Sequence, residues 1–231
     1  MCGRYGLQTP VNELARRLNA ELALEDPGPR YNAAPTQILP VARQPDPERR
    51  EVTGMEWGLV PFWAKDPRET RSKYSLINAR AESVADKPAF KAAFRRRRAL
   101  IPADGFYEWH QQGGDRPKQP YWIRLRSREP MFFAGLWERW EGEVDGEPKA
   151  IESFCIIVGE PNDLLASIHN RMPVVVDPAD WALWLDPEVR DAEPLRPLLR
   201  PYPAEAMEAV PVSRRVNSPA NDDPGLIEGM G

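Results

Sequence analysis

The sequence contains little cysteine and little histidine. Its 231 residues include only two of each, namely Cys2, Cys155, His110 and His169. Two cysteines cannot build a disulfide framework, and a reducing compartment would keep both as thiols. Two cysteines and two histidines at such wide spacing match no zinc-binding template. We therefore expect no disulfide and no metal, and the sequence indicates no other cofactor.

Long apolar runs and a strong net charge are also lacking. No stretch of ~20 residues is apolar enough to span a bilayer, and residues 1–20 contain no apolar core of a signal peptide. We therefore expect a cytoplasmic protein without a membrane partner. The formal net charge of −4 excludes a globally basic nucleic-acid binder, so binding to DNA would require a local basic groove.

Proline and apolar residues are plentiful. The 26 prolines favour many fixed loops over long helices, and the apolar fraction of 42% supports a substantial core. Thr9-Pro10 reads as an N-cap followed by the first residue of a helix, whose apolar face would begin at Val11 and end at Leu18. A second helix is predicted to run from Pro88 to Arg96, with Phe90, Ala93 and Phe94 inward. Shorter helices are expected near residues 162–168, 180–185 and 189–199, and residues 62–72 are expected to form a surface loop.

The predicted strands are irregularly spaced among these helices. Strands are expected at Gln37–Ala42, Val52–Leu59, Tyr121–Arg126, Met131–Trp140 and Ser153–Val158. Because strands and helices do not alternate regularly, the order favours the α+β class. We expect one domain over residues 1–212 and a flexible C-terminal tail over residues 213–231, which are polar and rich in glycine and proline.

The start of the chain can carry unusual chemistry. Removal of Met1 would leave Cys2 with a free amine and a thiol on adjacent carbons, with reference pKa values of roughly 8 and 8.5. The amine can condense with an aldehyde to an imine, and the sulfur can then close a five-membered thiazolidine ring. Gly3 leaves room for a substrate to approach. Position alone favours the plainer interpretation, in which Cys2 is a small buried apolar residue.

Three further polar positions are candidates for the same site. Glu108 lies among aromatic residues, where burial would raise its pKa into the range useful for proton transfer, although a strand glutamate facing solvent is as consistent with the pattern. His169 could move protons near neutral pH, although a histidine at a helix C-terminus is the commoner situation. Asn78 with Arg80 could hold a phosphate or orient a reacting group, or could simply close a strand.

Aromatic and basic residues could contact nucleic acid. Trp57, Trp63 and Trp137 could stack on bases, although core or rim packing is more common for tryptophan. The run of four arginines at 95–98 could contact phosphates, but solvated cations at a helix C-terminus are the favoured interpretation.

Together, six segments of the sequence resemble one family, the SRAP family of abasic-site-processing proteins, also known as SOS-response-associated peptidases. The segments occur in the family's order and cover roughly residues 1–212. They are Met1-Cys2-Gly3-Arg4, Trp57-Gly58-Leu59-Val60-Pro61, Asn78-Ala79-Arg80-Ala81-Glu82, Ile101-Pro102-Ala103-Asp104-Gly105-Phe106-Tyr107-Glu108-Trp109, Ala134-Gly135-Leu136-Trp137-Glu138 and His169-Asn170-Arg171-Met172-Pro173.

The resemblance implies a fold, an activity and a set of site residues. It implies one α+β domain with a barrel-like mixed sheet and a positively charged groove for single-stranded DNA. It implies that Cys2 forms a covalent thiazolidine crosslink to abasic sites, with Asn78, Glu108 and His169 around it. Lyase-type Schiff-base chemistry and autocatalytic removal of Met1 follow from the same resemblance. The implied DNA contacts are Arg4, Asn32, Pro35, Trp57, Arg80 and Arg171.

The resemblance also implies the partners. These are single-stranded DNA containing abasic sites and, during the DNA damage response, the replication machinery. We expect a monomer that associates with the nucleoid when bound to DNA. Two alternatives stay open at the level of sequence. One is a non-covalent reader of modified bases or single-stranded DNA, which would not need a free terminal aminothiol. The other is an N-terminal-nucleophile peptidase acting on protein substrates.

Overall fold

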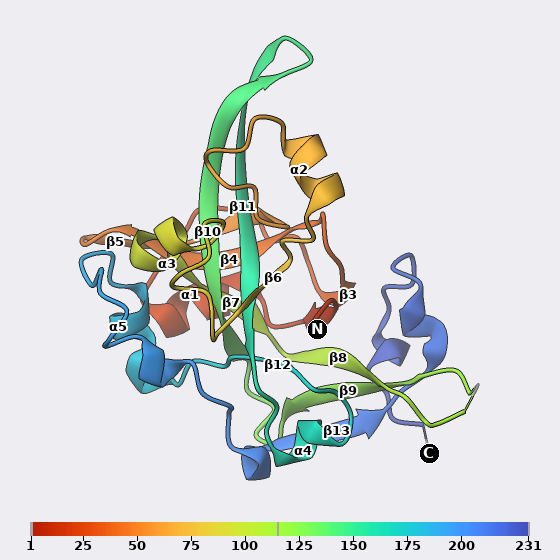
Figure 1. The fold of residues 1–231 in the computed structure, drawn as a ribbon. Coiled ribbons are helices and arrows are strands. Elements are labelled where there is room, and N and C mark those ends of the chain that lie inside the picture. Colours follow the sequence, from red (N-terminus) through yellow and green to blue (C-terminus); the bar gives the residue numbers. More distant parts are fainter. Residues whose placement is uncertain (1, 115, 231) are drawn as a thin grey trace.

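A closed barrel of five strands forms the centre of the computed structural model, which describes residues 2–114 and 116–230 (Figure 1). Strands β4 and β5 make a hairpin whose turn is fixed by Asp46, because its carboxylate accepts hydrogen bonds from the amides of Glu48 and Arg49. The order continues antiparallel from β4 through β7 and β10 to β11, and a parallel pairing of β11 with β5 closes the ring. The barrel strands are β4 (Ile38–Asp46), β5 (Arg49–Trp57), β7 (Arg98–Ala103), β10 (Met131–Val144) and β11 (Glu147–Gly159).

A second sheet of five strands lies below the barrel in the view of Figure 1. Its order is β13-β9-β8-β1-β3, which places the first strand of the chain between two strands from elsewhere in the sequence. These strands are β1 (Tyr5–Leu7), β3 (Arg30–Ala33), β8 (Gly105–His110), β9 (Gln119–Leu125) and β13 (Met207–Pro211). Three short strands extend the barrel sheet, namely β2 (Glu21–Leu22), β6 (Asn78–Arg80) and β12 (Met172–Pro173). The α+β class and the barrel-like mixed sheet are confirmed.

The helices are few and short. They are α1 (Val11–Leu18), α2 (Pro67–Lys73), α3 (Lys91–Arg96), α4 (Asp163–Ala166) and α5 (Trp181–Leu185). Helix α1 buries the predicted apolar face from Val11 to Leu18, but Thr9 does not cap it. The Thr9 hydroxyl instead donates to Asp104, whose carboxylate also binds the Thr9 amide. No helix in the described part of the chain has the length and apolar character needed to cross a membrane.

Two helix predictions were wrong. Residues 62–72, expected to be a surface loop, include helix α2, because Asp66 accepts from the amides of Arg68 and Glu69 and Pro67 follows at the first helical position. Residues 189–199, expected to be a helix, contain only a 3₁₀ turn at Arg196–Leu198. The capping residue Asp66 can be recognised from the sequence. The helix was missed because its residues are mostly charged or polar and therefore show no apolar periodicity.

The arginine run after α3 is not simply solvated. Arg98 is 2% exposed, and its guanidinium donates to the carbonyls of Phe94, Trp184 and Asp186. Burial lowers the pKa of Arg98 to about 10. Arg98 therefore ties the end of α3 to α5, and neither the solvated nor the phosphate-contacting interpretation applies to it.

The C-terminal segment is packed, which corrects the predicted tail. Residues 213–230 form two 3₁₀ turns, and Val216 and Leu226 are buried beside Tyr107 and Trp122. The Asp222 carboxylate accepts from the backbone amides of β3. The folded domain therefore extends past residue 212. The side chains of Val216, Leu226 and Asp222 anchor the C-terminal segment although its sequence is mostly polar.

Candidate functional site

The second sheet positions Cys2. The amide of Tyr107 donates to the carbonyl of Arg4 at 3.0 Å, and Tyr5 pairs with Phe106 in the register of β1 and β8. This pairing carries the start of the chain along β8, so that Cys2 comes near Glu108. Cys2 is 0% exposed. Cys2 is therefore buried, as its position alone suggested, and it also lies beside the titratable carboxyl of Glu108.

The thiol of Cys2 strongly favours its protonated form. Burial raises its pKa well above the ordinary range of a thiol, and the nearby carboxylate of Glu108 raises it further. A resting thiolate is consequently disfavoured. Any reaction of the sulfur requires a base that removes its proton as the new bond forms.

Glu108 has the properties of such a proton-transfer group. It lies on β8 and is 2% exposed, which excludes the alternative that its side chain faces solvent. Burial is the main cause that raises its pKa to about 7. Near neutral pH the carboxyl is therefore present in both protonation states, which suits a group that both donates and accepts a proton.

His169 follows α4 and faces Glu108. The distance between His169 Nε2 and Glu108 Oε2 is 3.9 Å. His169 Nδ1 lies 3.1 Å from the amide nitrogen and 3.2 Å from the carbonyl oxygen of Arg171, so Arg171 fixes the orientation of the ring with Nε2 towards the carboxyl. Burial lowers the pKa of His169, so the neutral ring is favoured. The structure thus places Glu108 near both Cys2 and His169, and the roles that the resemblance implies for these three residues stay predictions.

Asn78 is the first residue of β6, which pairs with β11 through Ile156. Both polar atoms of its side chain are buried, and neither has a hydrogen-bond partner among residues 2–114 and 116–230. A buried amide without a partner is costly, so it is available to bind a polar group.

Two residues near the site were not predicted from the sequence, namely Tyr5 and Lys118. The hydroxyl of Tyr5 is buried without a hydrogen-bond partner in the described chain, and burial, with a smaller contribution from the nearby Cys2, raises the pKa of Tyr5 well above its ordinary value. Lys118, exposed before β9, acts electrostatically on both Glu108 and His169. Tyr5 could have been suspected because it is close to Cys2 in sequence. Lys118 had no such signal, since only the pairing of β8 with β9 brings it near.

The three arginines predicted to contact DNA differ in their environments. Arg80 is exposed and has no ion pair among the described residues. Arg171 forms an ion pair with Glu82. The guanidinium of Arg4 is engaged by the C-terminal segment, donating to the carbonyls of Val216 and Asn217 as well as to a side chain of β3. Arg80 is therefore the most accessible of the three to a phosphate.

The remaining predicted DNA contacts have other environments. Trp57 is 0% exposed, stacks on Phe154 and donates through Nε1 to the carbonyl of Ile77, so its prediction as a DNA contact was wrong. Asn32 is 1% exposed, and its amide nitrogen donates to three carbonyls of the C-terminal segment, so it holds that segment. Pro35 is half-buried in the loop after β3, and its predicted role stays a prediction.

Exposed aromatic side chains occur instead on the segment before α2. Phe62 is 55% exposed and Trp63 is 49% exposed. Trp137, the third tryptophan considered for stacking, is 8% exposed and has Arg43 over its ring. Of the three tryptophans, Trp63 alone presents a large free face.

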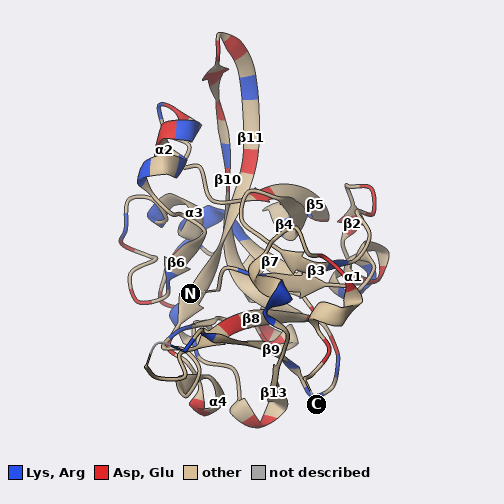
Figure 2. Cartoon of the chain, turned by 90° about the vertical axis from the view of Figure 1, so that its right-hand side faces the viewer, with Lys and Arg blue, Asp and Glu red and all other residues tan. Residues whose placement is uncertain are grey.

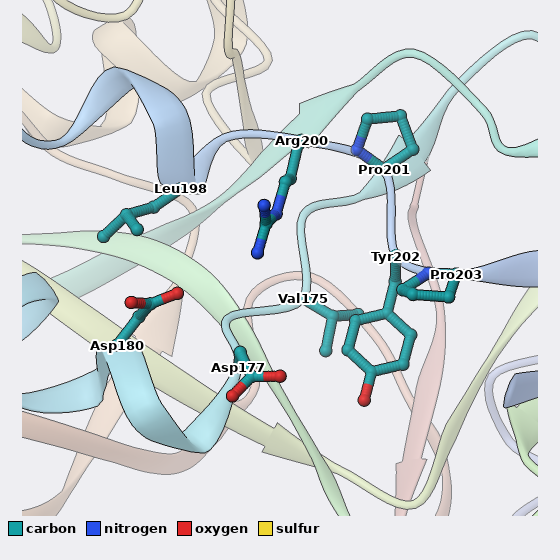
Figure 3. Close-up of a pocket in the computed structure, with 8 residues that line it drawn as sticks. All are labelled: Val175, Asp177, Asp180, Leu198, Arg200, Pro201, Tyr202 and Pro203. Atoms are coloured by element: carbon teal, nitrogen blue, oxygen red, sulfur yellow. The ribbon is translucent and has the colours of Figure 1, made fainter.

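A cavity of about 380 Å³ is lined by a different set of residues, between Val175 and Pro203 in the sequence (Figure 3). Arg200 lies across it from Asp177 and Asp180, and Tyr202 forms another side. None of Cys2, Asn78, Glu108 or His169 lines this cavity. Its lining residues include no cysteine, serine or histidine.

Comparisons with known proteins agree on one family. The family described as SOS response associated peptidase (SRAP) matches residues 1–219. Abasic site processing protein YoqW of Bacillus subtilis (strain 168) is 39% identical over 99% of this chain and 99% of its own length. Abasic site processing protein HMCES of Gallus gallus is 33% identical over 86% of this chain and 66% of its own.

A solved structure shares the fold. A protein from Bacteroides thetaiotaomicron has a TM-score of 0.85 and 26% sequence identity, covering 99% of this chain and 100% of its own. The barrel and the second sheet are therefore arranged as in an experimentally determined relative.

Proposed function

Because this chain belongs to the SOS response associated peptidase (SRAP) family, we propose that it processes abasic sites in single-stranded DNA by bonding to them covalently through Cys2. The observation that carries the proposal is the buried pair of Cys2 and Glu108, in which the carboxyl has its pKa raised to about 7. The names of the relatives, abasic site processing proteins, supply the substrate class.

The first step is condensation. An abasic deoxyribose opens to an aldehyde at its first carbon. Once Met1 is removed, the α-amine of Cys2 adds to this carbon, and the hydroxyl of the resulting carbinolamine takes up a proton and leaves as water, which gives a protonated imine. Met1 lies outside the described residues. A proton must reach the departing hydroxyl, and protonated Glu108 is the group whose pKa suits this task.

The second step is ring closure. The sulfur of Cys2 adds to the carbon of the protonated imine as the thiol gives up its proton, which gives the thiazolidine with its N–H. Because burial disfavours the free thiolate, the ionised Glu108 formed in the first step takes the thiol proton and returns to its protonated form. His169, whose Nε2 lies 3.9 Å from Glu108 Oε2, is the second titratable group beside this carboxyl. The closed ring lacks the imine that β-elimination requires, so the strand is protected from breakage.

Substitution of Glu108 by glutamine tests its role as a proton carrier. Glu108→Gln keeps the side-chain volume and removes the titration, so capture of abasic DNA is expected to slow by about 10²- to 10⁴-fold. In the parent protein the rate should fall as pH rises through about 7, where the carboxyl loses its proton, and this limb should vanish in the variant. Single-turnover rates from pH 5 to 9 measure both effects. An unchanged pH profile would remove Glu108 from the mechanism.

Arg80 is expected to bind the DNA backbone and to play no part in the chemistry. Arg80→Ala should weaken capture of abasic oligonucleotide and reduce the slope of log affinity against log salt by about one, since one phosphate contact is lost. The reaction of Cys2 with a small free aldehyde should be unaffected. Arg126→Ala removes an exposed arginine beside β9 and serves as the control. If Arg80→Ala slows both reactions equally, Arg80 supports the pocket and does not contact DNA.

A further inference from the structure

The hairpin of β10 and β11 extends beyond the barrel as an arm, residues 138–153 (Figure 1). Strand β7 pairs with β10 only from Met131 to Leu136, and β5 pairs with β11 only at Ser153 and Phe154. Most of the arm therefore has no third strand. A two-stranded ribbon is marginally stable in water, so an ordered arm requires contacts with another element.

Those contacts come from the segment of residues 60–73, here called the aromatic loop, which ends in α2. Val60 and Ala64 form a small apolar cluster with Trp140 and Ile151 of the arm, separate from the main core. Trp140 Nε1 donates to the carbonyl of Ala64 at 2.7 Å, and the amide of Val60 donates to Ser153 Oγ at 2.9 Å. Both hydrogen bonds are buried, which makes them costly to break.

Two charged contacts add to this cluster. Near the tip of the arm, Asp145 pairs with Arg68 of α2 at 2.7 Å, where acidic positions of the arm lie beside basic positions of the helix (Figure 2). This pair is exposed and contributes little. At the base of the arm, Glu138 is 2% exposed and pairs with Arg97 at 2.7 Å. The guanidinium of Arg97 lies 6.0 Å from the centre of the Phe62 ring.

Gly142 shows that the arm accommodates the Trp140 ring. A Cβ atom at Gly142 would lie 2.5 Å from the Trp140 ring, a distance that real Cβ atoms do not adopt. The missing side chain leaves the space in which the ring covers the ribbon and reaches Ala64. The arm thus has a specific fit to the aromatic loop.

Phe62 and Trp63 are the exposed aromatic pair of the aromatic loop. Helix α2, in which the loop ends, lies on the same side of the molecule as the start of the chain in the views of Figures 1 and 2. The amide of Leu59, just before the loop, donates to the carbonyl of Leu76, two residues before Asn78. The loop therefore connects directly to the strand that carries Asn78.

We propose that the arm is a positioning element that holds the aromatic loop so that Phe62 and Trp63 stack on bases next to the nucleotide captured by Cys2. The proposal rests on the proposed function for its ligand, single-stranded DNA. An unsupported loop would have to be ordered on binding and would lose part of the stacking energy to that ordering. Trp140 is the central positioning residue, because it supplies both the apolar contact and the hydrogen bond to Ala64.

The experiment measures affinity for undamaged single-stranded DNA by fluorescence anisotropy, which needs no covalent chemistry. Trp140→Ala is expected to weaken binding by about 5- to 150-fold, the range for loss of one base–aromatic stack. Trp140→Phe, which keeps the packing and removes the donor to Ala64, should weaken it less. Glu143→Gln alters an exposed arm residue with no described ion pair or hydrogen bond and should bind normally. Melting temperatures identify any variant that fails to fold. If Trp140→Ala does not fold, reduced DNA affinity in Trp140→Phe and Ser153→Ala supports the proposal, and parent affinity in both contradicts it.

A combined variant separates positioning from general support. In a protein already carrying Phe62→Ala and Trp63→Ala, Trp140→Ala should cause no further loss of affinity, because the residues through which it acts are gone. Losses that multiply, or normal binding by Trp140→Ala and Trp140→Phe, would overturn the proposal. A parent protein that binds DNA in this pattern but forms no adduct with abasic DNA would instead overturn the proposed function alone.

Discussion

Cys2→Ala is expected to abolish the heat-stable adduct with abasic single-stranded DNA. Alanine keeps the α-amine, so an imine can still form, but no sulfur is present to close the ring. An imine hydrolyses on heating, and its adjacent carbon can lose a proton and break the strand by β-elimination. Denaturing gel electrophoresis should therefore show the adduct with the parent protein and only cleaved oligonucleotide with the variant. The expected loss is complete within detection, larger than for any proton-transfer residue.

The second cysteine provides a matched control. Cys155 on β11 is also 0% exposed, and burial likewise raises the pKa of its thiol well above the ordinary range. Cys155→Ala should form the adduct at the parent rate. Cys2→Ser should give a product only when borohydride is present to reduce the imine. An adduct that survives in Cys2→Ala and disappears in Cys155→Ala would show that Cys155 is the nucleophile and that the assignment to Cys2 is wrong.

Blocking the amine is expected to be as damaging as removing the sulfur. With Met1 retained, or with a tag fused before Cys2, the nitrogen of Cys2 is part of an amide, whose lone pair is delocalised and does not attack an aldehyde. The thiol alone can add to an aldehyde, but the resulting hemithioacetal reverses readily. No heat-stable adduct should form, and titrating the extended protein against abasic oligonucleotide would measure this.

A removable tag makes this second test internally controlled. Cleavage that leaves Cys2 as the first residue should restore the adduct in the same preparation, which shows that the protein was folded throughout. An adduct that forms equally before and after cleavage would mean that the amine of Cys2 takes no part and that another nucleophile reacts.

Much of the core was predictable because local patterns and packing agree. Helix α1 buries its predicted face, and strands β9 and β10 overlap the predicted strands Tyr121–Arg126 and Met131–Trp140. Glu108 and His169 were ambiguous singly, because a glutamate on an apolar strand can face either way and a histidine at a helix C-terminus can simply interact with the helix dipole. The motif resemblance resolved the ambiguity, and the burial of Glu108 agrees with it.

The errors share a cause, which is contact between residues distant in sequence. The C-terminal segment has the composition of a mobile tail, yet it is anchored by Asn32, whose partners lie more than 180 residues away. Arg4 also donates hydrogen bonds to carbonyls of this segment. Arg4 therefore holds the C-terminal segment, whether or not it also contacts a DNA phosphate. Trp57 reads as a base-stacking residue only because nothing in its own segment reveals Tyr5 and Phe154, which cover it.

The arm shows the same limit for an element that patterns did locate. The strands of the hairpin were predicted, but their length beyond the barrel and their contacts with the aromatic loop depend on pairing of Val60 and Ala64 with Trp140 and Ile151. No spacing rule connects residues so far apart. Such contacts matter for function because they decide which exposed aromatic side chains hold a fixed position.

Intact mass spectrometry of the protein mixed with single-stranded DNA bearing one abasic site tests the central claim most directly. The account predicts a protein lacking Met1 whose adduct has the summed mass of protein and oligonucleotide minus one water. Borohydride should not add two hydrogens to this product, because a thiazolidine has no carbon–nitrogen double bond. Unmodified oligonucleotide with protein that begins at Cys2, or a product that borohydride reduces quantitatively, would contradict it.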